Sequence, residues 1–233
     1  MHPPIAAVVL DFDGLILDTE TPVFEAWCAA FRRHGQELSL LDWQHALGTN
    51  GGFDPMARLA GLTGGAVDRA AVLAEVQEAN RRACDAQPLL PGVERLLVEA
   101  EGLGLGRAVA SSSSRAWVEG WLTRHGIRER FPVVCGRDDV ARVKPAPDLF
   151  LLAAERLGVP PAACLVFEDS PNGMRAARAA GMRCVAVPNT LTRQLALPDP
   201  DLVLGSLVER PLRAILAELG GGGVPAQARR VRR

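Results

Sequence analysis

The chain has 233 residues, of which 23% are charged, and a formal net charge of −1. Nothing in this near-neutral balance predicts nucleic-acid or membrane binding through bulk electrostatics, and the length suits one large domain or a core with a small second domain. Five scattered cysteines without a C-x-x-C pair favour reduced thiols in a cytoplasmic protein and argue against a cysteine-based zinc site.

The first predicted element is a buried strand over residues 5–10, an apolar and β-branched run too short for a typical helix. Because no basic segment precedes it, we expect no signal peptide and no membrane span. The strand ends at Asp11-Phe12-Asp13-Gly14. Two carboxylates at this position are costly unless compensated, and Mg²⁺ is the usual compensator because it binds carboxylate and phosphate oxygens. The alternative is a simple strand-ending turn, in which Asp-Gly is common.

A helical block is predicted next, with no strand among residues 21–87. Thr21-Pro22 are expected to begin its first helix, as the N-cap and the first helical residue, and Gly35 to end it. Further helices are predicted over 39–47, 54–61 and 66–85. Large apolar residues at helical spacing are interpreted as the core of this block rather than as pocket walls: Trp27, Trp43, Phe53 and Met56.

From Leu90 onward helices and strands alternate. Helices are predicted over 92–102, 114–125, 147–157, 171–180 and 209–219, and strands over 107–110, 132–135, 164–168, 183–187 and 202–204. This order predicts an α/β fold, a Rossmann-like doubly wound parallel sheet with helices on both faces. Residues 1–19 and 88–219 would form the core, and the inserted all-α block, residues 20–87, would cap the ligand edge of the sheet. The arginine-rich stretch 220–233 is predicted to be a disordered basic tail.

Polar residues occur at the ends of further strands. Ser111–Ser114 follow strand 107–110, where hydroxyls and free helix N–H groups could hold an anion; ordinary N-capping is the alternative for at least one of them. Lys144 precedes Pro145 and would present a charge at a fixed place, unless it is a solvated loop lysine. Glu168 and Asp169 repeat the acidic pair after strand 164–168. All four signals lie at strand ends, so we expect one common site.

These motifs resemble those of the haloacid dehalogenase superfamily. The resemblance extends over about residues 5–219 and depends on DFDGLILDTE (11–20), ASSSSR (110–115), VKPAPD (143–148) and VFEDSPNG (166–173). It is closest to the branch with a small helical cap after the first strand, which includes phosphoglycolate phosphatases, sugar-phosphate phosphatases and beta-phosphoglucomutases.

The resemblance implies a role for each motif residue. Asp11 would be the nucleophile that forms an aspartyl-phosphate, and Asp13 the general acid and base. Lys144 and Ser111 would hold the phosphoryl group, and Gly14 and Ser112 would help to bind the substrate. The implied cofactor is Mg²⁺, with ligands from Asp11, the Asp13 backbone carbonyl, Asp169 and Glu168, the last directly or through water.

The resemblance favours a phosphatase that hydrolyses a small phosphorylated metabolite such as a sugar phosphate. Beta-phosphoglucomutases carry a histidine at the position of Val23 and an arginine in the cap loop, whereas no basic residue precedes Arg58 in this loop. A mutase is therefore the alternative. Thr49 and Asn50 are expected to recognise the leaving group, unless they are only turn residues.

Two other classes of protein agree less well with the motifs. A signalling receiver domain lacks a large helical insertion, and an inactive binding protein would be expected to have lost one of the four polar groups. The chain is expected to be a monomer, with no nucleic-acid or membrane partner.

Overall fold

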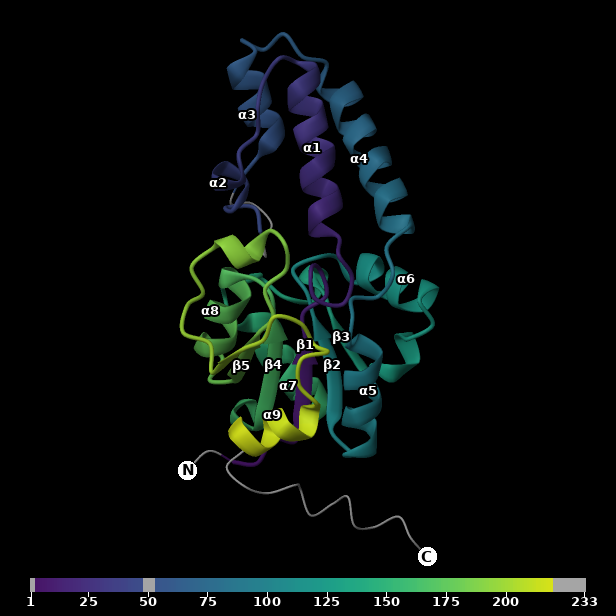
Figure 1. Cartoon of the computed structure of the whole chain (residues 1–233), viewed down its shortest axis with the longest axis vertical. Helices are drawn as coiled ribbons and strands as arrows, with labels where there is room; N and C mark the ends of the chain where they lie inside the picture. Colours follow the sequence, from purple (N-terminus) through teal and green to yellow (C-terminus); the bar gives the residue numbers. More distant parts are fainter. Residues whose placement is uncertain (1–2, 48–52, 220–233) are drawn as a thin grey trace, which may run out of the picture.

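The computed structural model describes residues 3–47 and 53–219 (Figure 1). Six parallel strands form one sheet in the order β3-β2-β1-β4-β5-β6. They are β1 (Ala7–Leu10), β2 (Gly106–Ala110), β3 (Val133–Cys135), β4 (Cys164–Glu168), β5 (Arg183–Ala186) and β6 (Leu202–Val203). The chain runs outward from β1 to β3 and then returns to β4 on the other side of β1, which confirms the predicted doubly wound α/β class. The direction of winding reverses between β1 and β4, the place where such sheets bind ligands.

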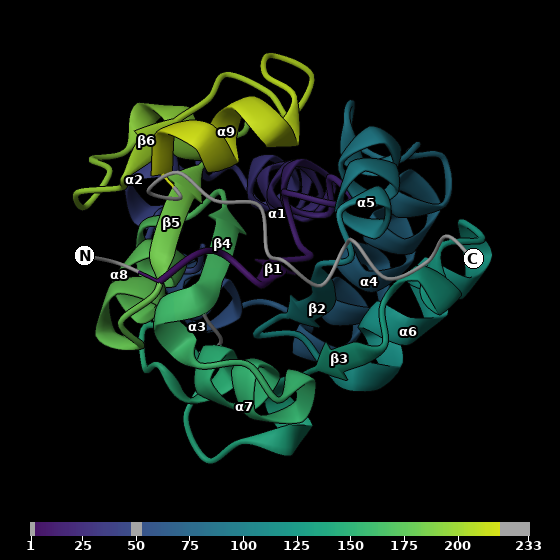
Figure 2. The ribbon, with the colours of Figure 1, turned by 90° about the horizontal axis from the view of Figure 1, so that it is seen from below.

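Helices cover both faces of this sheet (Figure 2). On one face lie α5 (Val93–Gly102), α6 (Arg115–Arg124) and α9 (Leu212–Leu219), and on the other lie α7 (Asp148–Leu157) and α8 (Pro171–Ala179). Successive side chains of β1 alternate between the two apolar clusters, with Val8 and Leu10 in one and Ala7 and Val9 in the other. Four short 3-10 helices span Arg128–Arg130, Arg137–Asp139, Pro161–Ala163 and Thr192–Gln194. Both faces of the sheet are therefore buried, as expected for parallel strands.

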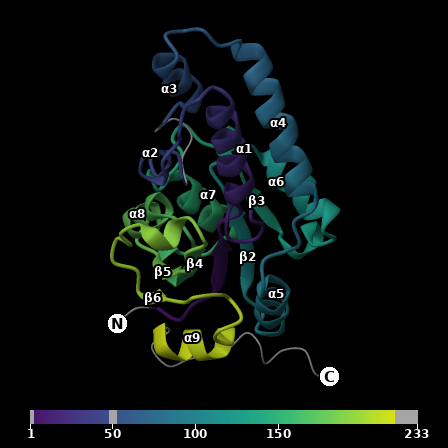
Figure 3. The same ribbon diagram turned by 45° about the horizontal axis from the view of Figure 1, so that its top comes forward.

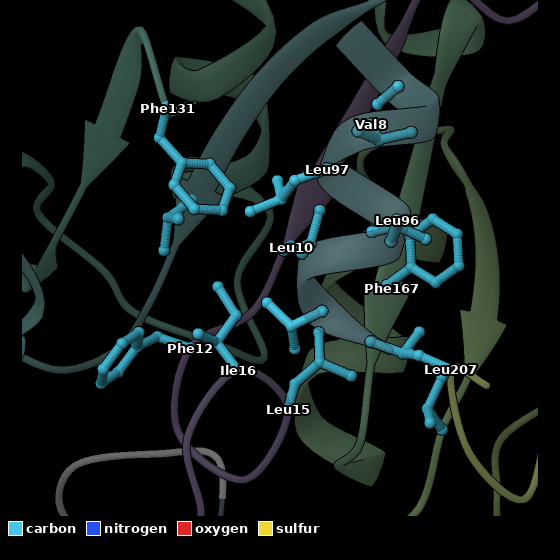
Figure 4. Packing of buried hydrophobic residues seen from close by; sticks show 14 of the residues in the cluster. Val8, Leu10, Phe12, Leu15, Ile16, Leu96, Leu97, Phe131, Phe167 and Leu207 are labelled. Carbon is cyan, nitrogen blue, oxygen red and sulfur yellow. The ribbon is translucent and has the colours of Figure 1, made fainter. Parts of the chain in front are cut away.

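The loop that follows β1 is anchored in the core. Phe12, Leu15 and Ile16 are each at most 1% exposed and pack in the same cluster as Leu10 (Figure 4). The polar residues between them, Asp11 and Asp13, are consequently held in fixed places at the carboxyl end of the strand.

Four helices lie beyond this end of the sheet (Figures 1 and 3). They are α1 (Glu20–Arg33), α2 (Leu40–Trp43), α3 (Pro55–Leu62) and α4 (Arg69–Asp85). They share an apolar cluster that also takes in Leu191 from the segment after β5. In this cluster Trp27, Trp43 and Met56 are buried and Phe53 packs at the margin. These residues are therefore core residues of the helical block, as the sequence indicated.

Several predicted boundaries are wrong for local reasons. The first helix begins at Glu20 with Thr19 as N-cap, because the Thr21 N–H donates to Asp18 Oδ1 (3.0 Å) and the chain is already turning there. The helix predicted over 39–47 ends at Trp43 and continues as turns. The helix predicted from residue 66 begins at Arg69, since the Asp68 side chain caps it, and the last helix begins at Leu212. Across the described residues, no helix is long and apolar enough to cross a membrane.

Candidate active site

A cluster of carboxylates lies where the winding of the sheet reverses. Asp11 follows β1, and Glu168 and Asp169 lie at the end of the neighbouring strand β4. All three are buried, and each offers a carboxylate oxygen within 4.8 Å of the others. The Asp11 N–H donates to the Phe167 carbonyl (3.0 Å), which fixes the register between the two strand ends. The structure thus brings together the two acidic pairs that the sequence places at separate strand ends.

Lys144 lies inside this cluster and is only 1% exposed. Its ammonium donates to Asp11 Oδ1 and to Glu168 Oε1 (2.6 Å), and it lies 4.9 Å from the centre of the Phe150 ring. Burial lowers the pKa of Lys144, but the charges of Asp11 and Glu168 outweigh burial and raise it. The alternative of a solvated loop lysine is therefore wrong. Lys144 is also the one lysine of the whole sequence, in which every other basic side chain apart from histidine is arginine.

Glu168 is held by the beginning of α8. Its Oε2 accepts hydrogen bonds from the N–H (2.8 Å) and the hydroxyl (3.0 Å) of Ser170, the N-cap residue of that helix. A Cβ on Gly173 would lie 1.7 Å from Glu168 Oε1, so only glycine allows the helix to approach this closely. Both oxygens of Glu168 are therefore already occupied by protein donors.

Asp169 has a free acceptor. Its Oδ2 accepts from Asn189 Nδ2 (2.7 Å), whereas its buried Oδ1 accepts no hydrogen bond from any residue that the structure describes. Burial is the largest cause that raises the pKa of Asp169, followed by the charges of Glu168 and Asp11. Gly14 (φ +85°) passes so close that a Cβ there would lie 2.7 Å from Asp169 Oδ2. An unpaired buried carboxylate oxygen beside two further carboxylates has the donor chemistry of a divalent-cation site.

Asp13 lies outside this cluster and is held by side-chain donors. Its Oδ1 accepts from the Thr19 hydroxyl (2.7 Å) and from Trp117 Nε1 (3.1 Å), and its Oδ2 accepts from the Ser111 hydroxyl (2.9 Å). The hydroxyl of Ser111, which we expected to hold a phosphoryl oxygen, is buried and directed at Asp13 in this structure. The two aspartates of the first motif thus have different surroundings, Asp11 beside a lysine and Asp13 among neutral donors.

The serines after β2 have different roles in the structure. Ser111 also accepts from the Ser113 N–H (2.9 Å), and Ser114 is the N-cap of α6, as the capping alternative predicted for one of the four. Ser112 is partly buried in the same loop. Thr49 and Asn50 lie outside the described residues.

Three residues of this site were missed in the sequence. Thr19 lies between predicted elements, Trp117 lies within the helix predicted over 114–125, and Asn189 follows β5. Asn189 could have been found by the strand-end argument, because it lies two residues after strand 183–187 as predicted. The hydrogen bond from Trp117 depends on how α6 packs, and no spacing in the sequence encodes that.

The pKa of Asp11 leads to a prediction about stability. Burial raises the pKa of Asp11 from 3.8 to about 8, against the opposing effect of Lys144. Between about pH 4 and about pH 8 the folded chain therefore retains a proton on Asp11 that the unfolded chain releases. The contribution of Asp11 to the free energy of unfolding is greatest below about pH 4 and falls as the pH rises toward about 8. In EDTA, the thermal midpoint of Asp11→Asn should rise relative to that of the wild type as the pH increases from about 5 to about 8. A difference between the two midpoints that stays constant with pH would contradict this assignment.

The fold and the site define a class of protein, α/β enzymes with a carboxylate site at the switch point of the sheet. A family model for haloacid dehalogenase-like hydrolases matches residues 5–181. YhcW of Bacillus subtilis (strain 168) is 43% identical over 215 residues, which cover 92% of this chain and 98% of YhcW. The fructose-1-phosphate phosphatase YqaB of Escherichia coli (strain K12) is 39% identical over 195 residues, 80% of this chain and 98% of YqaB.

Among solved structures, CbbY from Rhodobacter sphaeroides in complex with phosphate has a TM-score of 0.70 and 32% identity, and the match covers 88% of this chain and 96% of CbbY. The chain belongs to the haloacid dehalogenase-like hydrolases and is a phosphatase of that family.

Proposed function

We propose that this chain is a Mg²⁺-dependent phosphatase that hydrolyses a small sugar phosphate through an aspartyl-phosphate on Asp11. The observation that carries the proposal is the buried group of Asp11, Glu168 and Asp169 around Lys144, at the switch point of the sheet. Acidic side chains outnumber cations in this part of the described chain. An anionic ester therefore needs additional positive charge to bind.

Asp11 and Asp169 are the residues best placed to hold a divalent cation that supplies this positive charge. Both are buried carboxylates, and Oδ1 of Asp169 has no hydrogen-bond donor among the described residues. Glu168 would support them, since its own oxygens accept from Lys144 and Ser170. A bound Mg²⁺ would supply charge neutralisation for the phosphoryl oxygens.

In the first half-reaction an oxygen of Asp11 attacks phosphorus. A new bond forms between Asp11 and phosphorus, and the bond from phosphorus to the ester oxygen breaks. Lys144 holds Oδ1 of Asp11, so the attacking carboxylate cannot rotate freely. The departing alkoxide takes a proton from Asp13.

In the second half-reaction water attacks the same phosphorus. Asp13 accepts the proton of the water, the bond between Asp11 and phosphorus breaks, and inorganic phosphate leaves. The donors around Asp13 hold its carboxylate for both proton transfers. Each residue then returns to its starting protonation state.

The relatives support a sugar phosphate as the substrate. YqaB is named as a fructose-1-phosphate phosphatase. CbbY from Rhodobacter sphaeroides has been solved in complex with xylulose 1,5-bisphosphate, and this structure matches the present chain with 32% identity and a TM-score of 0.71. Hydrolysis is favoured over a mutase reaction because neither feature of the beta-phosphoglucomutases is present. Val23, at the position of their histidine, is aliphatic and packs against the apolar cluster of the cap helices. Arg58, the first basic residue after the cap loop, is exposed on α3.

The test is phosphate release from fructose 1-phosphate, glucose 6-phosphate, ribose 5-phosphate, glycerol phosphate and phosphoglycolate, with and without Mg²⁺. Release that requires Mg²⁺ and is fastest with a sugar phosphate supports the proposal. Interconversion of glucose 1- and 6-phosphates without phosphate release would identify a mutase instead. A preference for a substrate that is not a sugar would overturn the assigned substrate class.

Mg²⁺ should also stabilise the fold. A metal at about 100 times its dissociation constant adds about 2.7 kcal/mol to the free energy of unfolding. Asp169→Asn should lose most of this gain, because it removes the charge of the unpaired carboxylate. Asp201→Asn is a matched control, because Asp201 lies near the amino end of β5, away from the site at the carboxyl ends of the strands. Its Oδ2 accepts from the Cys184 N–H (2.7 Å), and asparagine keeps an acceptor oxygen there. Equal stabilisation by Mg²⁺ in both variants would exclude Asp169 as a ligand.

A further inference from the structure

We propose that Trp117 is a positioning residue that fixes the orientation of the Asp13 carboxylate for proton transfer. The inference depends on the proposed function, in which Asp13 gives and takes the proton of each half-reaction. It concerns a residue of α6, separated from Asp13 by more than a hundred positions in the sequence, whose indole N–H lies 3.1 Å from Asp13 Oδ1.

The three donors around Asp13 differ in what they can fix. The hydroxyls of Thr19 and Ser111 rotate, and each can act as donor or acceptor. The indole of Trp117 has a single N–H in a rigid ring and can only donate. Trp117 is therefore the donor that specifies where Oδ1 must lie, whichever way the hydroxyl protons turn.

The indole is held in place independently of Asp13. The backbone N–H of Trp117 donates to the hydroxyl of Ser114, the N-cap residue (3.3 Å). The Trp117 ring packs edge to face against the Trp121 ring, with ring centres 5.5 Å apart. Trp121 is buried, and the guanidinium of Arg124 lies 5.4 Å from the centre of its ring. Arg124 in turn pairs with Asp85 (2.9 Å), the last residue of α4. The donor is thus anchored on the helix side and does not follow the carboxylate if that group moves.

Trp117 also differs from a residue that only fills the core. It is partly exposed and lines an open cavity of about 280 Å³ together with Asp85, Gly120, Trp121 and Arg124. Its neighbour Trp121, one helical turn away, is more deeply buried, and no hydrogen bond to Asp13 is found for it among the described contacts. Because Trp121 supports the Trp117 ring, the matched control is taken from the cap helices: Trp43 is also a buried tryptophan, it packs in the apolar cluster of those helices, and its indole N–H has no hydrogen-bond partner among the described residues.

The consequence depends on the leaving group. A sugar alkoxide needs the proton of Asp13 to depart, whereas p-nitrophenolate is stable without one. The second half-reaction needs Asp13 as a base with either substrate. A misdirected Asp13 should therefore slow phosphorylation of Asp11 by a sugar phosphate but not by p-nitrophenyl phosphate, and should slow dephosphorylation in both cases.

The test compares Trp117→Phe with Trp43→Phe by rapid-quench kinetics, with p-nitrophenyl phosphate and with the sugar phosphate of the panel that the wild type hydrolyses fastest. We expect Trp117→Phe to slow phosphorylation by the sugar phosphate about tenfold or more, with KM changed less than about threefold and phosphorylation by p-nitrophenyl phosphate within about twofold of wild type. With p-nitrophenyl phosphate it should also release a burst of p-nitrophenolate before a slow steady state. Trp43→Phe should match the wild type in all these measurements.

Two results would overturn the inference. Equal slowing of phosphorylation by both substrates would show general damage to the site, and no slowing with either would show that Asp13 is positioned without the indole. Trp117→Met provides a second variant with an apolar side chain that has no N–H or O–H donor, to be used if the phenylalanine variant does not fold. A wild type inactive on every ester of the panel would instead refute the proposed function.

Discussion

Asp11→Asn is expected to reduce the hydrolysis of every phosphate ester at least about 10⁴-fold while leaving the chain folded. The amide cannot form the aspartyl-phosphate, so chemistry through a phosphoenzyme stops. The fold should survive because the asparagine carbonyl still accepts from Lys144, and because the substitution removes a carboxyl group whose ionisation beside Glu168 is unfavourable. Activity and stability should therefore move in opposite directions above neutral pH, where the raised pKa of Asp11 makes ionisation costly.

The measurement is kcat with the best substrate of the panel, together with the thermal midpoint of the same preparations. Asp201→Asn again provides the control, with activity within about threefold of wild type because it lies away from the chemistry. Residual activity of Asp11→Asn within tenfold of wild type would show that Asp11 is not the nucleophile.

Lys144→Met should be the most destabilising single substitution in the site. Lys144 is 1% exposed and is the counter-charge of the buried Glu168 and, once the pH exceeds its raised pKa, of Asp11, so its loss leaves the Glu168 carboxylate buried without a cation. Removing one partner of a buried ion pair costs about 3–5 kcal/mol. We expect a fall of this size in the free energy of unfolding in EDTA, measured by urea denaturation, and no detectable turnover.

The double variant Lys144→Met, Glu168→Gln separates charge from packing. If the uncompensated charge causes the loss, removing the Glu168 charge should restore at least about half of the lost stability. Failure to restore any stability would show that Lys144 acts through its packing against Phe150 instead. Because the sequence contains one lysine, ¹⁵N-labelled lysine also gives a single side-chain ammonium signal that should shift when Mg²⁺ or phosphate binds.

Strands β1, β2 and β4 could be predicted from the sequence because each is a short, mainly apolar run that ends at polar residues. Strand 164–168 was predicted with the bounds that the structure has, and the acidic pairs at 11–13 and 168–169 meet because β1 and β4 are neighbours in the sheet. The two prolines that follow Lys144 correctly indicated a charge at a fixed place. That the charge is buried between two carboxylates is a property of the tertiary structure.

Apart from Asn189, the rest of the site could not be predicted, because it depends on side chains that meet across elements. Trp117 reaches Asp13 only through the packing of α6, and Thr19 reaches it because the helix begins earlier than Thr21-Pro22 suggested. The helix predicted over 39–47 failed in the opposite way, since its apolar spacing continues past Trp43 while the backbone turns. Hydrophobic periodicity locates helices, but their ends are set by capping contacts such as those of Ser39 and Asp68.

The most direct test of the central claim is mass spectrometry of the phosphoenzyme. The Asp13→Asn variant, which should form the aspartyl-phosphate from p-nitrophenyl phosphate but hydrolyse it slowly, is mixed with that ester and Mg²⁺, quenched in acid and digested. The account predicts one added phosphoryl group on the peptide that contains Asp11, absent in EDTA and absent when Asp11 is also replaced by asparagine. A phosphoryl group on another residue, or release of phosphate with Asp11 unmodified at every time point, would contradict it.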